Sequence, residues 1–290
     1  KTGYASISNT LFVDTGTDGR VGIGTSTPNN LIQVNGLINF NNSIFGAFLG
    51  YQAGNVTTGK YNTFVGYESG LVNTVGGVDI GVVEQLNSAL GYGSLRANTT
   101  GYHNTANGAR ALYSNIGGYY NTAVGKDALY ANSSGFSNTA VGVDALHFNT
   151  TGASNAAVGI DALYSNTTGS GNTALGAFAL GGGAYITGDF NIAIGNNTLT
   201  NLTAGSKNIV LGWQAGDAIT TGSGNIIIGS DIDAPSNTGN NQLSIGNLIF
   251  GTGIDGTGTT LSSGNIGIGT SAPSTKFEVR GTASASYGLF

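Results

Sequence analysis

A short block of alternating residues that ends in glycine recurs along the chain at a fixed interval. Between Asn121 and Gly125 the block reads Asn-Thr-Ala-Val-Gly, so an aliphatic residue stands next to the closing glycine. Successive closing glycines follow a 17-residue period, except for one 19-residue interval between Gly176 and Gly195. The series contains Gly91, Gly108, Gly125, Gly142, Gly159, Gly176, Gly195, Gly212, Gly229 and Gly246. Such a period predicts a stack of equivalent supersecondary units.

Alternation inside the block predicts a short strand in each repeat. The residue before the closing glycine is aliphatic in nearly every repeat, as in Val124, Val141 and Val158. The residue three before the glycine changes along the chain from threonine, as in Thr122, to isoleucine, as in Ile226. Since residues two apart share one face of a strand, we expect both columns to face the interior. The alanine column between them is then expected to face outward, where another surface packs closely against it.

A second glycine column and a leucine column complete the repeat. Glycine also recurs seven residues before every closing glycine from Gly108 onward, and glycine supplies the positive φ that tight corners need. Four residues after the closing glycine stand Leu95, Leu112, Leu129, Leu146, Leu163, Leu180 and Leu199. We expect a second short strand at this leucine column. The predicted fold class is therefore all-β: a parallel β-solenoid or β-roll with 17-residue coils.

The interior of such a coil is thin. The chain contains no cysteine, so disulfides cannot reinforce it. Burial of the small alanine side chains against other copies of the chain would supply the missing stability, because small residues permit close approach. We therefore expect a homo-oligomer, and specifically a homotrimer.

The ends of the chain differ from the repeat and resemble each other. The stretch Val21 to Pro28 reads Val-Gly-Ile-Gly-Thr-Ser-Thr-Pro, and Ile266 to Pro273 reads Ile-Gly-Ile-Gly-Thr-Ser-Ala-Pro. We therefore expect three parts: an N-terminal connector over residues 1–43, a repeat domain over 44–246, and a C-terminal connector over 247–290. The irregular spacing between Gly66 and Gly91 predicts a kink or a loop insertion inside the repeat domain.

Composition narrows the classes of function. The 290 residues include 51 glycines, 3 prolines and 8 % charged residues, and the net charge is −5. The few lysines and arginines are scattered, which argues against nucleic acid or anionic membrane surfaces as partners. The sequence has no run of 18 apolar residues, so we expect no membrane span in this segment. No residue pattern indicates a cofactor.

The repeat resembles a known family of adhesins. The blocks Asn121 to Gly125 and Asn225 to Gly229 are similar to the head repeats of YadA-like trimeric autotransporter adhesins. This resemblance covers about residues 44–246 and implies a left-handed parallel β-roll, three chains side by side, and adhesion at a cell surface. The 17-residue coil is longer than the usual coil of that family. The terminal motifs resemble modules of phage-type tail fibres and bacterial surface proteins that precede endosialidase-type intramolecular chaperones. Together they imply an extracellular, cell-surface or virion fibre.

One column of aspartates is the strongest candidate for a metal site. Asp127, Asp144 and Asp161 share one phase of the repeat, beside Lys126. We interpret them as an exposed row, and keep calcium binding as a weaker alternative because a hard cation needs six or more oxygen ligands. Catalysis is not expected, since a repeated column gives every carboxylate the same environment.

Asparagines and aromatic residues also recur in phase. The column Asn121, Asn138, Asn155, Asn172, Asn191, Asn208 and Asn225 predicts a stacked ladder of side-chain amides. Asn98, Asn149 and Asn166 open Asn-Thr-Thr sequences, which we interpret as turns, with glycosylation as the minority alternative. We expect structural roles for His103 and His147. We interpret Trp213 as an aromatic residue of the repeat, and keep a sugar-stacking platform as the weaker alternative.

These observations favour a structural and adhesive surface fibre segment without enzymatic activity. Multivalent weak binding along repeated rows would engage a surface glycan or protein receptor, and end-to-end association stays open. A tail-spike glycan depolymerase is one alternative, with Asp79, Glu84 and the stretch Asp231 to Asp233 as its only candidate carboxylates. An ice-binding solenoid with threonine rows is another. In later repeats isoleucine replaces threonine in the same column. This replacement implies that the threonines point inward, which argues against ice binding.

Overall fold

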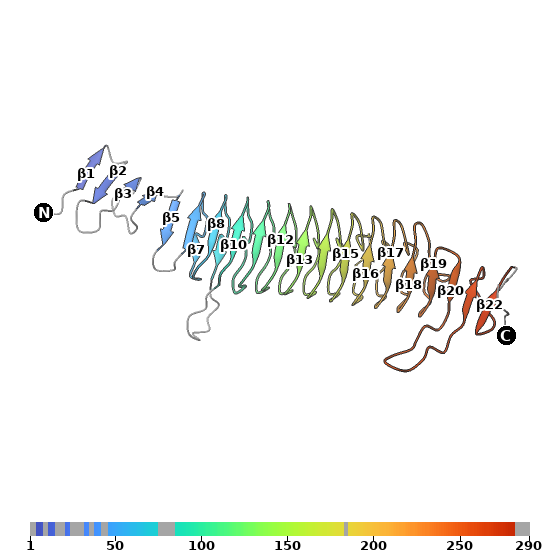
Figure 1. Cartoon of the computed structure of the whole chain (residues 1–290). Helices are drawn as coiled ribbons and strands as arrows, with labels where there is room; N and C mark the ends of the chain where they lie inside the picture. Colours follow the sequence, from blue (N-terminus) through green and yellow to red (C-terminus); the bar gives the residue numbers. More distant parts are fainter. Residues whose placement is uncertain are drawn as a thin grey trace. The chain divides into compact units, whose positions relative to one another are not determined.

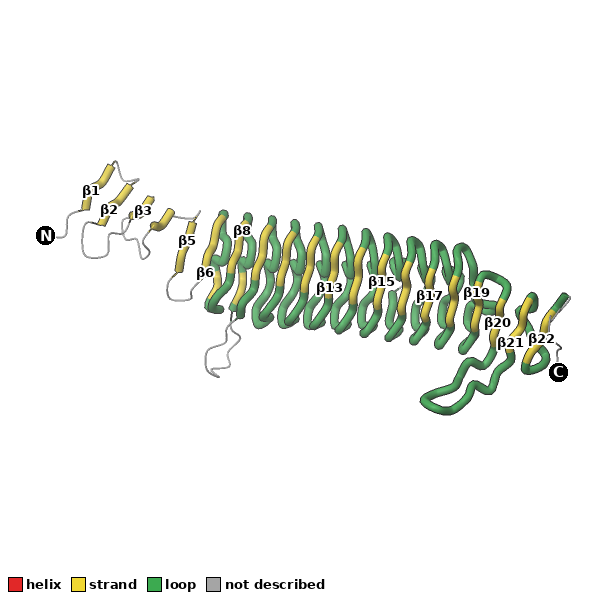
Figure 2. Tube along the Cα trace, viewed as in Figure 1, coloured by secondary structure: helices red, strands yellow, loops and turns green. Residues whose placement is uncertain are grey.

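The computed structural model describes residues 46–74, 85–182 and 185–281, and five short strands before Gly46. These five strands are β1 (Tyr4–Ile7), β2 (Leu11–Asp14), β3 (Val21–Ile23), β4 (Ile32–Val34) and β5 (Ile38–Asn41). The chain divides into two compact units, Lys1–Thr151 and Gly152–Phe290, and this boundary lies inside the repeats. The described residues form strands, turns and loops, and none of them is helical (Figure 2).

The first unit contains a ladder of parallel strands, each contributed by one coil (Figure 1). Its members are β6 (Gly46–Leu49), β8 (Thr63–Val65), β10 (Ser88–Leu90), β11 (Thr105–Asn107), β12 (Thr122–Val124) and β13 (Thr139–Val141). Each strand pairs with the next in parallel, and equivalent positions lie side by side. Strand β8 pairs directly with β10, Thr63 opposite Ser88. The irregular spacing therefore leaves the register of the ladder intact.

The second unit repeats this arrangement. Its ladder consists of β14 (Ala156–Val158), β15 (Thr173–Leu175), β16 (Ile192–Ile194), β17 (Ile209–Leu211), β18 (Ile226–Ile228) and β19 (Leu243–Ile245). All neighbouring pairs are parallel and in register. The longer interval before Gly195 changes nothing in the ladder, since Thr173 lies opposite Ile192. The predicted all-β parallel solenoid with 17-residue coils is thus confirmed in both units.

The prediction of a second strand at the leucine column is wrong. These leucines lie in turns, and their backbone is left-handed, with φ of 52° at Leu112 and 53° at Leu129. A left-handed backbone costs an L-residue roughly 1–2 kcal/mol. The side chains of both leucines are fully buried. The turn therefore directs a large apolar group into the core. A second short sheet occurs only where β7 (Val56–Thr57) pairs with β9 (Val72–Asn73), apart from an isolated bridge, among the described residues.

The predicted orientation of the strands is also wrong, because the alanine column faces the core. Ala123 and Ala140 are 0 % exposed, whereas Val141 is 36 % exposed and Leu175 is 48 % exposed. The columns three and one before the closing glycine therefore face outward. The core consists of this alanine column, a second alanine column three residues after the closing glycine, the leucine column, and buried asparagines. The second alanine column contains Ala111, Ala128, Ala145, Ala162, Ala179 and Ala215.

The two glycine columns serve different purposes. At the closing glycine the backbone has a φ near +136°, as at Gly125, and a Cβ there would lie 2.3 Å from the carbonyl oxygen of Gly142. At the other column, as at Gly118, φ is not in the left-handed region. The constraint there is crowding: an added Cβ would lie 2.3 Å from Oδ1 of Asn115 and 2.5 Å from the carbonyl oxygen of Gly135 in the next coil. Only the first column therefore needs glycine for its dihedral angle, and both need it for coil-to-coil approach.

The strands outside the ladders pair mainly with antiparallel neighbours. Strands β1, β2 and β3 are successively antiparallel, β4 is parallel to β3, and β5 joins β4 to β6 through antiparallel pairs. In the second unit, β20 (Ile249–Gly251) is antiparallel to β19 and to β21 (Ile266–Ile268). Strand β22 (Phe277–Val279) is parallel to β21.

Candidate binding surfaces

The outward face of the second unit's ladder is an apolar surface. Ile209 is 44 % exposed and Leu211 is 43 % exposed, and both belong to β17. Further exposed members are Val158, Leu175, Ile192 and Ile228. Because the ladder keeps its register, these side chains form two rows, with about 4.8 Å between neighbouring strands. No charged residue occupies either row from β14 to β19.

The same face of the first unit carries hydroxyl groups. One row contains Thr63, Ser88, Thr105, Thr122 and Thr139, which are exposed or half-buried. The second row contains Leu90, which is 51 % exposed, and Val141. The threonines therefore point outward, and the inference that they face the interior is wrong. Their orientation no longer counts against an ice-binding surface.

Exposed aromatic side chains form stacks that follow the coils of the first unit. The rings of Tyr51 and Tyr67 lie 5.2 Å apart, and those of Tyr67 and Tyr92 lie 5.5 Å apart. These three tyrosines are 46–54 % exposed. Since each ring stacks on the next, their faces are largely covered and their edges and hydroxyls are presented outward. Trp213 shares their repeat position and is 51 % exposed.

A second group of stacks includes both histidines. The rings of Tyr130 and His147 lie 5.0 Å apart, and Nδ1 of His147 lies 2.9 Å from Oδ1 of Asp144. His103 stacks on Tyr120 at 5.0 Å. The histidines thus lie in aromatic rows, as members of the repeat. Another row joins Tyr102, Tyr119 and Phe136 at 4.9 Å spacing.

A ladder of asparagines links the coils through side-chain to backbone hydrogen bonds. The Oδ1 atom of Asn121 accepts the backbone N–H of Asn138 at 3.0 Å and its Nδ2 at 3.2 Å. The Nδ2 atom of Asn121 donates to the carbonyl of Gly135 at 2.9 Å. Asn172, Asn191 and Asn208 repeat this arrangement in the second unit. Each buried amide therefore satisfies backbone groups of two neighbouring segments.

A second asparagine ladder was missed from the sequence. The Nδ2 atom of Asn115 donates to Oδ1 of Asn98 at 2.6 Å, and Asn132 and Asn149 continue the series. This ladder includes two of the asparagines in Asn-Thr-Thr sequences. Asn98, Asn149 and Asn166 are all 0 % exposed. The glycosylation alternative is therefore wrong, because a glycan must be attached to an accessible amide. The constant 17-residue spacing of the asparagines in this ladder was the signal in the sequence that could have revealed it.

The aspartate column is not a uniformly exposed row. Asp127 is 1 % exposed, and its Oδ2 atom pairs with Arg110 at 2.6 Å and with Lys126 at 2.8 Å. Asp144 and Asp161 are half-buried. The backbone at all three aspartates is left-handed, with φ between 54° and 57°. Aspartate is among the residue types enriched in this conformation, but Arg110 and Phe178 adopt it at the same repeat position, so the left-handed backbone belongs to the coil and not to the aspartates alone. The described residues contain no group of three or more histidine, aspartate or glutamate side chains that could hold a metal ion.

Acid is expected to weaken the first unit through Asp127. Burial raises the pKa of this carboxyl, but the hydrogen bonds from Lys126 and Arg110 outweigh burial, so its pKa lies below the ordinary 3.8. The ionised carboxylate therefore stabilises the fold above the pKa of the unfolded chain, and this contribution is lost as the pH falls through the lower folded pKa. Asp127→Asn should remove about 2 kcal/mol of stability at pH 7, typical of charged hydrogen bonds.

Denaturant unfolding from pH 7 to pH 2 checks this expectation. The difference between wild type and Asp127→Asn should shrink below about pH 4. Asp231→Asn is the matched control, because Asp231 has the same repeat position and a left-handed backbone but is exposed. Equal destabilisation by the two variants would contradict the assigned role of Asp127.

The structure describes only some of the carboxylates that were candidates for a depolymerase. Asp79 and Glu84 lie outside the described residues. Asp231 and Asp233 lie near Asp217, whose pKa is raised by burial and then by the charges of Asp233 and Asp231. The Oδ1 atom of Asp233 accepts the backbone N–H of Ala218 at 3.0 Å.

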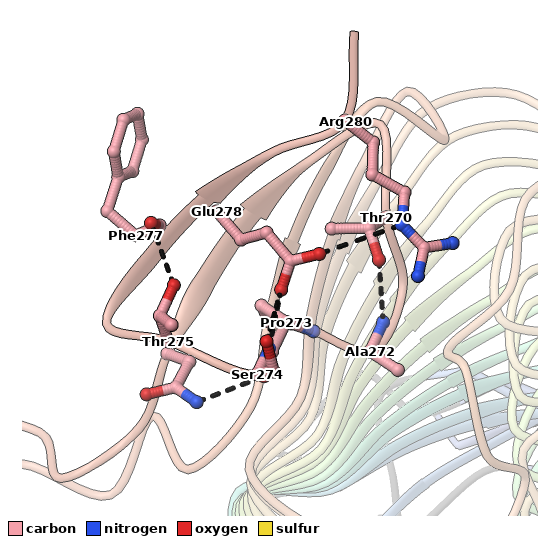
Figure 3. Close-up of polar contacts among 9 residues, drawn as sticks. Thr270, Ala272, Pro273, Ser274, Thr275, Phe277, Glu278 and Arg280 are labelled. Carbon is pink, nitrogen blue, oxygen red and sulfur yellow. Dashed lines mark hydrogen bonds and ion pairs between the residues drawn. The ribbon is translucent and has the colours of Figure 1, made fainter.

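The C-terminal copy of the repeated motif, Ile266 to Pro273, contains β21 and continues into the loop that joins β21 to β22 (Figure 3). Glu278 accepts two hydrogen bonds from Ser274 on its Oε2 atom, from the backbone N–H at 2.6 Å and from Oγ at 2.9 Å. These bonds lower the pKa of Glu278. Thr270 Oγ1 accepts the N–H of Ala272 at 3.4 Å, and Arg280 Nε lies 3.6 Å from Oε1 of Glu278.

Comparisons with protein-family models, curated proteins and solved structures found no match to this chain. The part of the chain that the structure describes has no helix able to span a membrane.

Proposed function

We propose that this chain is a non-catalytic segment of an extracellular surface fibre that self-associates and adheres through repeated rows of side chains. The observation that carries the proposal is the outward apolar face of the second unit, with Ile209, Leu211 and their equivalents exposed. A soluble chain rarely presents contiguous apolar area of this kind unless another surface covers it.

We propose that a second copy of the same chain covers this face. The rows repeat at the strand spacing, so an identical face has matching ridges and grooves, as in the packing of two sheets. We propose a homotrimer, in which three chains turn their ladder faces toward a common axis. The alanine columns do not take part, since they lie inside each coil.

Adhesion is assigned to the polar and aromatic rows outside this face. The rings of Tyr51, Tyr67 and Tyr92 follow one another at 5.2 and 5.5 Å, and all three residues are exposed. Weak contacts of one kind, repeated along each of several chains, gain avidity without any deep pocket. A surface glycan or protein is the proposed receptor, and the fibre would lie at a cell surface or on a virion.

The self-association is tested by placing charge on the apolar face. Ile209→Glu combined with Leu211→Glu should leave the coil folded, since both side chains point outward, and should reduce the oligomer to the 29.0 kDa chain. Sedimentation equilibrium measures the mass. Tyr185→Glu is the control, because it charges an apolar side chain that is 69 % exposed but lies in a loop. A wild-type protein that sediments with the mass of a single chain would refute the trimer.

Ice binding is a second candidate, favoured by the outward hydroxyl row of the first unit. Thr105, Thr122 and Thr139 lie on neighbouring strands in register, so their hydroxyls form a regular line that could order water. Thermal hysteresis of the wild-type protein, lost in Thr122→Lys, would support this function. Absence of thermal hysteresis would exclude it.

A further inference from the structure

One row of exposed tyrosines joins three successive coils of the first unit. Tyr51, Tyr67 and Tyr92 lie just after the ladder strands β6, β8 and β10, which pair in parallel and in register. Backbone hydrogen bonds hold these positions together. The N–H of Glu68 donates to the carbonyl of Tyr51 at 2.8 Å, and in the next coil the N–H of Gly93 donates to the carbonyl of Tyr67 at 2.9 Å. The three side chains are therefore kept next to one another along the stack of coils.

The rings of this row are close and nearly parallel. The ring centroids of Tyr51 and Tyr67 lie 5.2 Å apart with 22° between the ring planes, and those of Tyr67 and Tyr92 lie 5.5 Å apart with 16°. Because like side chains stack in register, the Cε carbons, which flank the carbon that bears the hydroxyl, approach those of the neighbouring ring. Each tyrosine is 46–54 % exposed, so its outer edge is accessible to a dissolved oxidant.

Stacking by itself does not require the phenol hydroxyl. In another row, the rings of Tyr119 and Phe136 stack at 4.9 Å with 4° between their planes, as closely as those of Tyr102 and Tyr119 at 4.9 Å and 5°. A phenylalanine ring therefore serves the stack as well as a tyrosine ring does. What the hydroxyl adds is redox chemistry. A phenol that loses one electron and one proton becomes a phenoxyl radical, whose unpaired electron is shared between the oxygen and the ring carbons, including both Cε carbons.

We propose that Tyr67 is a site of oxidative cross-linking, where one of its Cε carbons forms a bond with a Cε carbon of Tyr51 or Tyr92. The oxidant is a peroxidase with hydrogen peroxide, which takes one electron and one proton from each of two stacked tyrosines. The two radicals join through a carbon–carbon bond, each bonded Cε carbon loses its hydrogen as a proton, and each oxygen regains a proton. Two tyrosines and one hydrogen peroxide thus give one dityrosine and two waters. The bond joins neighbouring coils of a chain that contains no cysteine.

The test treats the full chain, in dilute solution, with a peroxidase and hydrogen peroxide. The chain contains no cysteine and no methionine that would compete for the oxidant. Fluorescence measures the dityrosine, and mass spectrometry locates it after cleavage at Lys60 and Glu68, which separates the three tyrosines of the row. Because the fold holds these rings together, links within the row should form at least about tenfold more than in the denatured chain. Equal yields in the folded and denatured chain, or links only between chains, would overturn the proposal.

Two variants that keep a stacked ring identify the site. Tyr67→Phe removes the central phenol, so both links of the row should disappear. Tyr51→Phe is the matched control and should keep the link between Tyr67 and Tyr92. Oxidation should also raise the denaturant concentration at which the wild-type chain unfolds, and raise it less in Tyr67→Phe, because a cross-link constrains the unfolded chain. A direct link between Tyr51 and Tyr92 in Tyr67→Phe, or equal shifts in the two chains, would contradict the assignment.

Discussion

Replacing Gly125 with alanine is expected to be among the most damaging single substitutions in the first unit. The backbone at Gly125 has a φ of +136°, which L-residues rarely adopt, and an added Cβ would lie 2.3 Å from the carbonyl oxygen of Gly142. The obstructing atoms belong to the backbone of the next coil, so they cannot move without breaking the ladder. We expect a loss of at least about 3 kcal/mol, from dihedral strain together with the steric clash.

Equilibrium denaturation of Gly125→Ala, followed by circular dichroism, measures this loss. Gly117→Ala is the control in the same unit. Gly117 has no left-handed φ, and its added Cβ would meet only the Thr100 hydroxyl, at 3.1 Å. Alanine at Gly117 should change stability by less than about 1 kcal/mol in either direction. Similar stabilities for the two variants would show that the coils are not packed backbone against backbone.

Truncation of Asn121 to alanine is expected to cost about 3–5 kcal/mol, because several buried polar groups lose their partners together. The side chain accepts from the backbone N–H of Asn138 and donates to the carbonyl of Gly135. Asn121 is 0 % exposed, so water cannot replace these bonds without opening the coil. Each orphaned buried group costs roughly 1–3 kcal/mol.

Thermal and denaturant unfolding measure the stability of Asn121→Ala, and the result is compared with a substitution at the next residue. Thr122→Ala is the matched control, since Thr122 lies on the outward face and is half-buried. It should cost less than about 1 kcal/mol. Asn121→Asp keeps an acceptor for Asn138 but cannot donate to Gly135, so it should be destabilising as well. An Asn121→Ala variant as stable as Thr122→Ala would contradict the ladder.

The period of the sequence was sufficient to predict the coils, their parallel register and the importance of glycine at both corners. It was not sufficient to predict which face of each strand is buried. Alternation places Thr122 and Val124 on one face of the strand and Ala123 on the other. Both faces carry apolar residues, so the pattern does not say which one is buried. The general preference for buried aliphatic residues favoured the wrong face. The inward column holds alanine in most coils but larger side chains in others, as at Phe64, Val210 and Ile227, so side-chain size alone did not identify the buried face.

The leucine turns could not be predicted from residue preferences. Leucine rarely adopts a left-handed backbone, so Leu112 and Leu129 read as strand residues. The cost of that backbone is offset by the full burial of each side chain, which is a property of the assembled stack. The second asparagine ladder, by contrast, had a signal in the sequence. Asn98, Asn115 and Asn132 keep one phase, and a constant phase in a buried column indicates a shared structural role.

The most direct test of the stacked, in-register coils uses pairs of introduced cysteines, since the chain has none of its own. Thr122 and Thr139 lie opposite each other on neighbouring strands, at a spacing of about 4.8 Å that allows a disulfide. We predict that Thr122→Cys with Thr139→Cys forms an intrachain disulfide on mild oxidation, shown by mass spectrometry of the cleaved chain. Thr122→Cys with Ala140→Cys should not form one, because those side chains lie on opposite faces. Equal crosslinking of both pairs, or of neither, would contradict the parallel solenoid.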